Sequence, residues 1–148
     1  MQDLNLPKYE FRTKQEGGKT LIFDVLRKKW INLTPEEWVR QNFVRYLLDL
    51  SYPLGRIGIE VGLDIGERKL RADGVVYNNF GEVIMLMEFK APQVAITEQV
   101  FAQAADYNTK ISSPYVIVSN GMIHYCAHII KDSVEMLNAI PAFTDICR

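Results

Sequence analysis

The sequence predicts an α/β (α+β) domain built on a mixed β-sheet, and three observations support this. Thr34 begins a stretch with helix-capping residues and helical apolar spacing. The apolar stretch 83–87 lies between turn signals, which is typical of a buried strand. Asn120-Gly121 separates two apolar stretches, as in a β-hairpin. The overall order is a helix, three strands, a second helix and two strands, which suits helices packed on a mixed sheet.

The composition is that of one soluble domain with a single core. The chain has 148 residues, 48% of them hydrophobic and 24% charged, with a net charge of −1. Its apolar runs are shorter than the roughly 18 residues of a spanning helix, and its first residues lack signal-peptide features. We therefore expect a cytoplasmic protein with no membrane partner. A charge this close to zero provides no overall basic field that would attract nucleic acid.

Residues 1–33 are expected to form a β-hairpin extension ahead of the core. Two short strands, at 11–13 and 20–25, flank the turn signals at 15–18. Residues 28–33 can add another extended piece. The expected organisation is a single domain in three parts: this extension, a core at 34–130, and a tail with a helix at 131–148.

The core begins with a helix. Thr34 is a suitable N-cap, Pro35 suits the first helical position, and Glu37 completes a capping box. Apolar residues then recur at helical spacing up to the break at 51–53, and these are Val39, Phe43, Leu47 and Leu50.

The remaining elements follow from strand, turn and breaker signals. Three strands are predicted at 56–63, 70–77 and 83–90, with turns at 64–67 and 78–81. A second helix is predicted from the Thr97 cap to about Asn108. The hairpin strands are predicted at 115–119 and 122–127, and a short helix at 134–140 before Pro141.

A carboxylate and an ammonium on the third strand are the most informative pair in the sequence. Glu88 and Lys90 lie two residues apart, so they share one face of the strand at roughly 6–7 Å. Asp73 is expected where a neighbouring antiparallel strand begins. Mg2+ prefers such carboxylates, with the Phe89 carbonyl as a further oxygen, and a lysine can orient an attacking water. The alternative is a Glu–Lys ion pair at a strand end, with Asp73 as a turn residue.

Two polar residues of the second helix are candidates for nucleic-acid contact. Gln103 and Tyr107 lie four residues apart and therefore face the same side, with Gln99 one turn earlier. An amide and an aromatic ring beside paired carboxylates can hold a DNA backbone. The alternative for Tyr107 is a half-buried position at the edge of the core.

Four ordered motifs resemble the nuclease domain at the N-terminus of type I restriction enzyme R subunits, which belongs to the PD-(D/E)xK superfamily. The resemblance covers nearly the whole chain, and residues 33–41 also resemble small stand-alone bacterial proteins of this group. It implies a restriction-endonuclease-like fold. The motifs are Arg71-Ala72-Asp73, Glu88-Phe89-Lys90-Ala91-Pro92, Gln103-Ala104-Ala105-Asp106-Tyr107-Asn108 and Ser119-Asn120-Gly121-Met122-Ile123-His124-Tyr125.

The resemblance also implies roles for individual residues. Asp73 and Glu88 would bind Mg2+, or Mn2+ in its place, and Lys90 would be the catalytic lysine. Gln103 and Tyr107 would match the family's QxxxY motif. Alanine stands before Asp73 where the superfamily name has proline. The implied function is a Mg2+-dependent endonuclease acting on DNA, of the restriction, defence or repair type.

Several alternatives stay open at this stage. The chain shows no helicase motor, so a motor or specificity subunit, or a homodimer, is expected for cutting both strands. A catalytically silent module that binds nucleic acid or a partner protein is the second interpretation, and RNA is not excluded as substrate. A third acidic residue often joins such sites: Glu37 is explained by the capping box, Glu36 lies on the helix stripe expected to face the sheet, and Glu60 is on the first strand.

Overall fold

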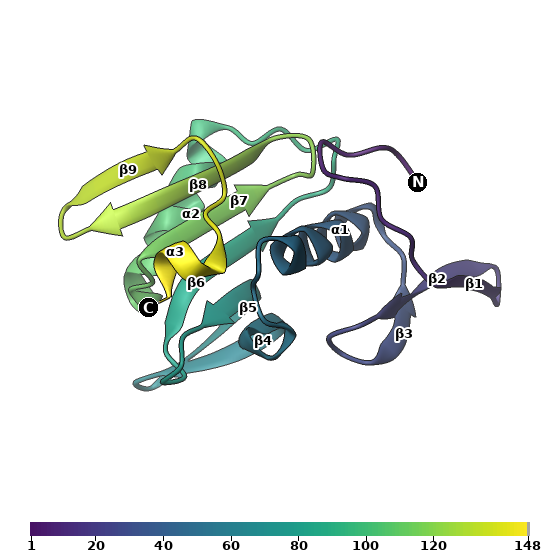
Figure 1. Cartoon of the computed structure of the whole chain (residues 1–148), viewed down its shortest axis with the longest axis horizontal. Coiled ribbons are helices and arrows are strands. Elements are labelled where there is room, and N and C mark those ends of the chain that lie inside the picture. The colour runs from purple at the N-terminus through teal and green to yellow at the C-terminus, as the bar shows by residue number, and fades with distance from the viewer. Residues whose placement is uncertain (148) are drawn as a thin grey trace.

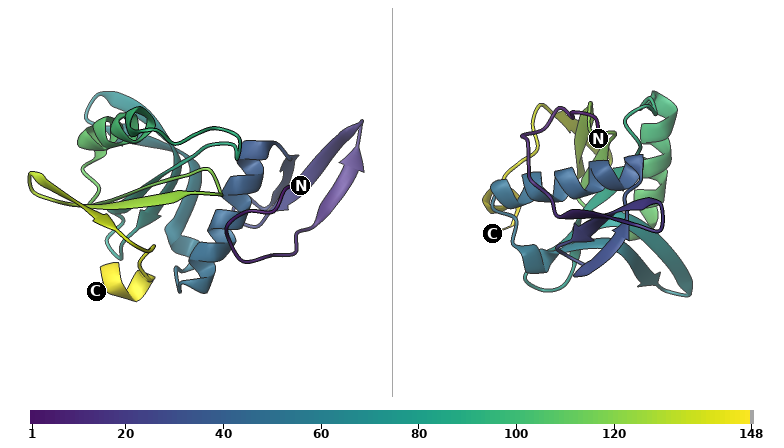
Figure 2. Two further views of the ribbon diagram at one scale, coloured as in Figure 1. Left: turned by 90° about the horizontal axis from the view of Figure 1, so that it is seen from above. Right: turned by 90° about the vertical axis from the view of Figure 1, so that its right-hand side faces the viewer.

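Two helices cover opposite faces of a six-stranded mixed sheet, and this confirms the predicted fold class (Figures 1 and 2). The computed structural model describes residues 1–147. Helix α1 is Pro35–Asp49 and helix α2 is Glu98–Ile111. Within residues 1–147, no helix is long and apolar enough to cross a membrane.

The main sheet has the strand order β4-β5-β6-β7-β8-β9. Only β6 and β7 are parallel among these neighbours, and α2 forms the crossover that joins them. The strands are β4 Ile57–Ile65, β5 Arg68–Tyr77, β6 Val83–Phe89, β7 Tyr115–Ser119, β8 His124–Ile130 and β9 Ser133–Leu137. A short 3-10 turn, Leu54–Arg56, precedes β4.

Strand β6 is buried on both faces because the two helices pack on either side of it. Met85 and Met87 belong to the cluster that contains Phe43 of α1. Leu86 points the other way and packs with residues near α2, including Tyr107. A central strand of this kind is apolar at successive positions, which explains the continuous apolar stretch in the sequence.

Helix α1 begins as predicted, but only half of the capping box forms. The Glu37 backbone N–H donates to Thr34 Oγ1 at 3.1 Å. The Glu37 carboxylate does not return to the Thr34 backbone, because it accepts hydrogen bonds from Arg27, Arg40 and Gln41. The interpretation of Glu37 as a simple capping residue is therefore wrong.

The N-terminal extension is a three-stranded antiparallel sheet, one strand larger than a hairpin. It projects beyond the first turn of α1, away from α2 (Figure 2). Its turn falls at Gly17 and Gly18, both with positive φ, so the first strand starts later than expected. The strands are β1 Thr13–Glu16, β2 Lys19–Asp24 and β3 Lys29–Asn32.

The predicted helix at 134–140 is wrong, because this segment forms the edge strand β9 paired with β8. Val134 and Met136 alternate with Glu135, and a period of two suits a strand. Both apolar side chains are largely exposed, at 57% and 49%. A short helix, α3 Phe143–Ile146, follows instead, and Phe143 packs on Tyr52 with ring centroids 5.3 Å apart.

Candidate active site

The candidate site lies at the end of the sheet where β5 and β6 stop pairing. Gly74 and Met87 are the last paired residues at this end, so Asp73 and Glu88 occupy the next positions. There the Phe89 N–H donates to Asp73 Oδ2 at 3.0 Å, so a side-chain oxygen takes the place of a strand carbonyl. The antiparallel register thus brings the two predicted carboxylates together from positions far apart in the sequence.

The two carboxylates are close enough to affect each other strongly. Burial and the charge of the neighbouring Asp73 raise the pKa of Glu88 to about 7. Lys90 acts in the opposite direction and favours the ionised form. Two carboxylates that share a half-buried site repel each other when both are ionised, and a bound cation relieves this repulsion.

Lys90 lies just beyond the end of β6, with its backbone N–H bonded to the Ser119 carbonyl at 2.9 Å. Within residues 1–147, no salt bridge joins Glu88 to Lys90. The alternative of a plain ion pair at a strand end is therefore not what the structure has. Both charged groups instead line the same pocket.

This pocket, of about 180 Å3, lies between the end of β6 and helix α2. Four of the five predicted site residues line it: Glu88, Lys90, Gln103 and Tyr107. Asp73 adjoins it through its contact with Glu88. The floor of the pocket on α2 is apolar, formed by Val100 and Ala104.

Tyr107 has a structural contact that the sequence did not predict. Its hydroxyl donates to the Arg71 carbonyl at 2.5 Å, two residues before Asp73. Its ring packs on the apolar cluster that contains Ala72 and Leu86. Tyr107 therefore fixes α2 on β5, whereas the side chain of Gln103 is exposed at the mouth of the pocket.

Arg40 of α1 is a site residue that sequence reasoning missed. Its side chain is buried, with only 5% of it exposed, and Nη2 lies 3.8 Å from Asp73 Oδ1. The same nitrogen lies 2.8 Å from Glu60 and 3.3 Å from Glu36, while Nη1 is bonded to Glu37. Arg40 is thus the cation that faces Asp73 from the α1 side.

A continuous series of ion pairs extends from Arg40 in both directions. Arg27 donates to Glu37 at 2.6 Å and to Asp24 at 2.5 Å, which ties in the turn between β2 and β3. On the other side Arg71 contacts Glu60 at 3.0 Å. In order along the series these residues are Asp24, Arg27, Glu37, Arg40, Glu60 and Arg71, and we call them the ion-pair chain.

The structure separates the three candidates for an additional acidic residue. Glu37 is held between two arginines of the ion-pair chain. Glu60 stands opposite Asp73, between the pairs Ile59–Gly74 and Val61–Ala72 of β4 and β5, and its φ of 51° is in the left-handed region. Glu36 has a half-exposed side chain whose pKa is raised by burial and by Asp73.

The donor set fits a hard divalent cation that brings further ligands with it. Among residues 1–147, no three His, Cys, Asp or Glu side chains gather closely enough to hold a metal ion by themselves. Mg2+ usually takes only one or two protein carboxylates and completes its shell with water and phosphate oxygens. The pair Asp73 and Glu88 matches that pattern.

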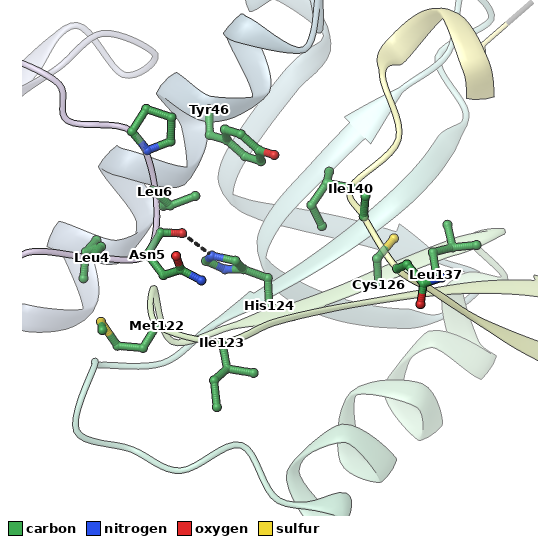
Figure 3. Close-up of a pocket in the computed structure, with 13 residues that line it drawn as sticks. Leu4, Asn5, Leu6, Tyr46, Met122, Ile123, His124, Cys126, Leu137 and Ile140 are labelled. Carbon is green, nitrogen blue, oxygen red and sulfur yellow. Dashed lines mark hydrogen bonds between the residues drawn. The ribbon is translucent and has the colours of Figure 1, made fainter.

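A larger cavity, of about 740 Å3, carries no comparable chemistry (Figure 3). It lies on the α1 side, between the N-terminal segment, Tyr46 and β8, and none of the described residues that line it is Asp or Glu. Its His124 donates from Nε2 to the Asn5 carbonyl at 2.9 Å and lies 2.7 Å from Ser119 Oγ. Burial lowers the pKa of His124, so this histidine is a neutral structural residue.

Comparison with known proteins identifies both a family and a fold. The family model described as type I restriction enzyme R protein N terminus (HSDR_N) matches residues 35–141. Among solved structures, a fragment of a putative HsdR subunit of a type I restriction enzyme from Vibrio vulnificus YJ016 is similar, with a TM-score of 0.59 and 16% identity. The match covers 77% of this chain but only 24% of that one. No curated protein matches the sequence.

Proposed function

The chain belongs to the family of type I restriction enzyme R protein N termini, and on this premise we propose that it is a Mg2+-dependent nuclease that hydrolyses DNA phosphodiesters. The reaction would be in-line attack of water on the scissile phosphate. A role in restriction or defence suits the family better than one in repair. The match covers about a quarter of the solved chain, and we propose a motor or specificity subunit of a restriction system as a partner.

One observation supports this proposal above the others. The residues that the nuclease motifs single out come from two distant segments of the sequence, yet Glu88, Lys90, Gln103 and Tyr107 line one pocket. Asp73 contacts Glu88 at its edge. A structural role alone does not require two carboxylates and a lysine together at the end of a sheet.

The protein residues have distinct roles in the proposed reaction. Asp73 and Glu88 would hold Mg2+, or Mn2+ in its place. Glu36, which shares Arg40 with Asp73, would add a water-mediated contact. When bound, the ion supplies a Lewis acid beside the scissile phosphate and makes a nearby water more acidic. Lys90 orients the attacking water and offsets the negative charge that develops on the phosphate oxygens.

Other residues would position these groups and the substrate. Arg40 would position Asp73 from the α1 side, because the Arg40 side chain is buried and is bonded to three further carboxylates. Gln103 would donate to the DNA backbone from the exposed side of α2. Tyr107 would hold α2 in position on β5 through its hydrogen bond to the Arg71 carbonyl.

Cleavage of DNA by the purified protein tests the proposal. Supercoiled, linear and single-stranded DNA would be incubated with Mg2+ or Mn2+, beside the Lys90→Ala and Asp73→Ala variants. We expect metal-dependent cleavage that EDTA abolishes and that both variants lack. Lys110→Ala is the matched control, because Lys110 is an exposed lysine on the same helix as Gln103 but outside the pocket.

Calorimetry separates the nuclease from a catalytically silent module. Mg2+ binding that is present in the wild type and lost in Asp73→Ala supports an active site. The proposal is overturned if no DNA form is cut with either metal and Mg2+ does not bind even with DNA present. Cleavage by Lys90→Ala at the wild-type rate would equally contradict it.

A further inference from the structure

The small N-terminal sheet has one face against the rest of the protein and one face toward solvent. Ile22 and Asp24 of β2 are fully buried. Phe23 lies between them and therefore points to the opposite face, where it pairs with Trp30 of β3. The two rings contact each other edge to face, with centroids 5.5 Å apart. Two aromatic residues on an outward face are not explained by core packing alone.

Two cations lie on these rings. The Arg12 guanidinium is 4.6 Å from the centroid of Phe23 and 5.4 Å from that of Trp30. The Lys14 ammonium is 4.5 Å from the Trp30 centroid and also 3.0 Å from Glu16. Cation–π contact fixes a charged group in place without using its N–H donors. We call Arg12, Lys14, Phe23 and Trp30 the basic–aromatic face.

Positive charge is concentrated in this part of the protein. Residues 1–33 contain seven Lys and Arg against four Asp and Glu, whereas the whole chain has a net charge of −1. The rest of the chain is therefore acidic. A local basic region on an otherwise acidic protein attracts a polyanion to one place and one orientation.

The basic–aromatic face is attached to the end of the molecule that holds the candidate site. Strand β3 ends at Asn32, and α1, which carries Arg40, starts at Pro35 (Figure 1). The ion-pair chain links the turn between β2 and β3 to Arg40, which faces Asp73. This sheet lies outside the residues that match the family, 35–141.

We propose that the basic–aromatic face binds the phosphate backbone of the DNA next to the candidate site. Arg12 and Lys14 make the phosphate contacts, and the two rings hold them in place so that less side-chain freedom is lost on binding. Such contacts position a duplex without reading its sequence. The inference rests on the proposed function, because it assigns a second surface to the same substrate.

Binding of a fluorescent DNA duplex, measured by anisotropy in EDTA at several salt concentrations, tests the inference. Arg12→Gln with Lys14→Gln should weaken binding, and the slope of log K against log salt should become shallower by about 0.9 for each lost phosphate contact. Arg12→Lys with Lys14→Arg should restore both affinity and slope. Trp30→Leu keeps the charges, so it should weaken binding less and leave the slope unchanged.

The matched control removes two positive charges elsewhere. Lys110→Gln with Lys131→Gln changes exposed residues on α2 and on the β8–β9 turn, and it should alter neither affinity nor slope. Unchanged binding by the Arg12 and Lys14 double variant, or an equal loss in the control, would overturn the inference. If that double variant binds normally while the wild type cuts DNA, only this inference fails. If it loses binding while the wild type never cuts DNA, the inference holds and the proposed nuclease function fails.

Discussion

The two sides of the candidate site differ in how their charges are paired. On the α1 side, Arg40 is buried among carboxylates, and each neighbour in the ion-pair chain has a partner of opposite charge. On the α2 side, Glu88 and Lys90 line an open pocket, and no salt bridge within residues 1–147 involves either of them. Asp73 lies between the two sides and contacts both.

This difference separates the α1 side, whose paired charges support the structure, from the α2 side, whose charges are available for binding and catalysis. A buried ion-pair network fixes geometry, but it is stable only while every member is present. Like charges held together without a counter-ion lower stability, and proteins retain them where a ligand makes use of them. The α1 side should therefore respond to mutation through folding, and the α2 side through binding and catalysis.

The largest effect is expected from removing the central cation of the α1 side. Arg40→Met removes a buried cation that lies beside four carboxylates and leaves Glu37 and Glu60 with one arginine each, so the free energy of unfolding should fall by about 3–5 kcal/mol. Urea denaturation measures this. Arg68→Met, at the exposed first position of β5, is the control and should change stability by less than about 0.5 kcal/mol. An unfolding midpoint for Arg40→Met equal to that of the wild type would remove the distinction between the two sides.

Removing the cation of the α2 side should lower activity and leave stability almost unchanged. Lys90→Ala is expected to slow DNA cleavage by about 10²–10³-fold, through lost stabilisation of the developing charge. Its unfolding free energy should stay within about 0.5 kcal/mol of the wild type, because Lys90 forms no salt bridge within residues 1–147. Single-turnover cleavage and urea denaturation on the same preparation test both statements. A loss of activity that tracks a loss of stability would contradict them.

Neutralising one carboxylate should stabilise the metal-free protein. Glu88→Gln removes the repulsion from Asp73, and at about pH 8 in EDTA it should raise the unfolding free energy by about 1–2 kcal/mol, a range reduced for the partly exposed position. Mg2+ should then stabilise the wild type and not the variant. A destabilised Glu88→Gln protein would show that the two carboxylates are not held against each other.

The same pair predicts a pH dependence of stability with a definite sign. The folded protein raises the pKa of Glu88 from 4.5 to about 7, so between these values the folded state binds more protons than the unfolded state. The contribution of Glu88 to stability therefore falls as pH rises through this window and levels off above it. In EDTA, the unfolding free energy of Glu88→Gln should lack this decrease with rising pH. An equal dependence of unfolding free energy on pH in the wild type and the variant would contradict the raised pKa of Glu88.

The smallest expected effect concerns the contact that joins the α2 side to the sheet. Tyr107→Phe removes the hydrogen bond to the Arg71 carbonyl but keeps the packed ring, so stability should fall by about 0.5–1.5 kcal/mol. Differential scanning calorimetry measures this loss. DNA affinity should change little if the hydroxyl is purely structural. A loss of DNA affinity with unchanged stability would return Tyr107 to the DNA-binding role predicted from sequence.

Local signals made the main elements predictable. The Thr34 cap, the apolar stretch of β6 and the Asn120-Gly121 turn each depend on neighbouring residues, so the sequence carries them directly. The sequence of the edge strand β9 predicts a helix, because a short apolar segment does not determine its own pairing. Its conformation is set by the neighbouring strand β8.

Long-range pairing explains what the sequence could not reveal about the site. Asp73, Glu88 and Lys90 were recognisable because they sit in ordered motifs with a strand between them. Arg40 was not, since its importance comes from partners on other elements, such as Glu60. The only local sign was a group of polar residues on the inward side of α1, next to Val39. Such a sign is ambiguous until the facing strands are known.

The ion-pair chain has a consequence for how this domain can be moved or shortened. The segment that matches the family begins at residue 35, yet Arg27, which neutralises Glu37, and Asp24, which pairs with Arg27, both precede it. At the other end Phe143 lies beyond the match and packs into the core. The family segment is thus not a portable unit. A chimera that grafts only residues 35–141 onto a motor protein would carry a destabilised nuclease, whereas one that retains both flanks would keep it intact.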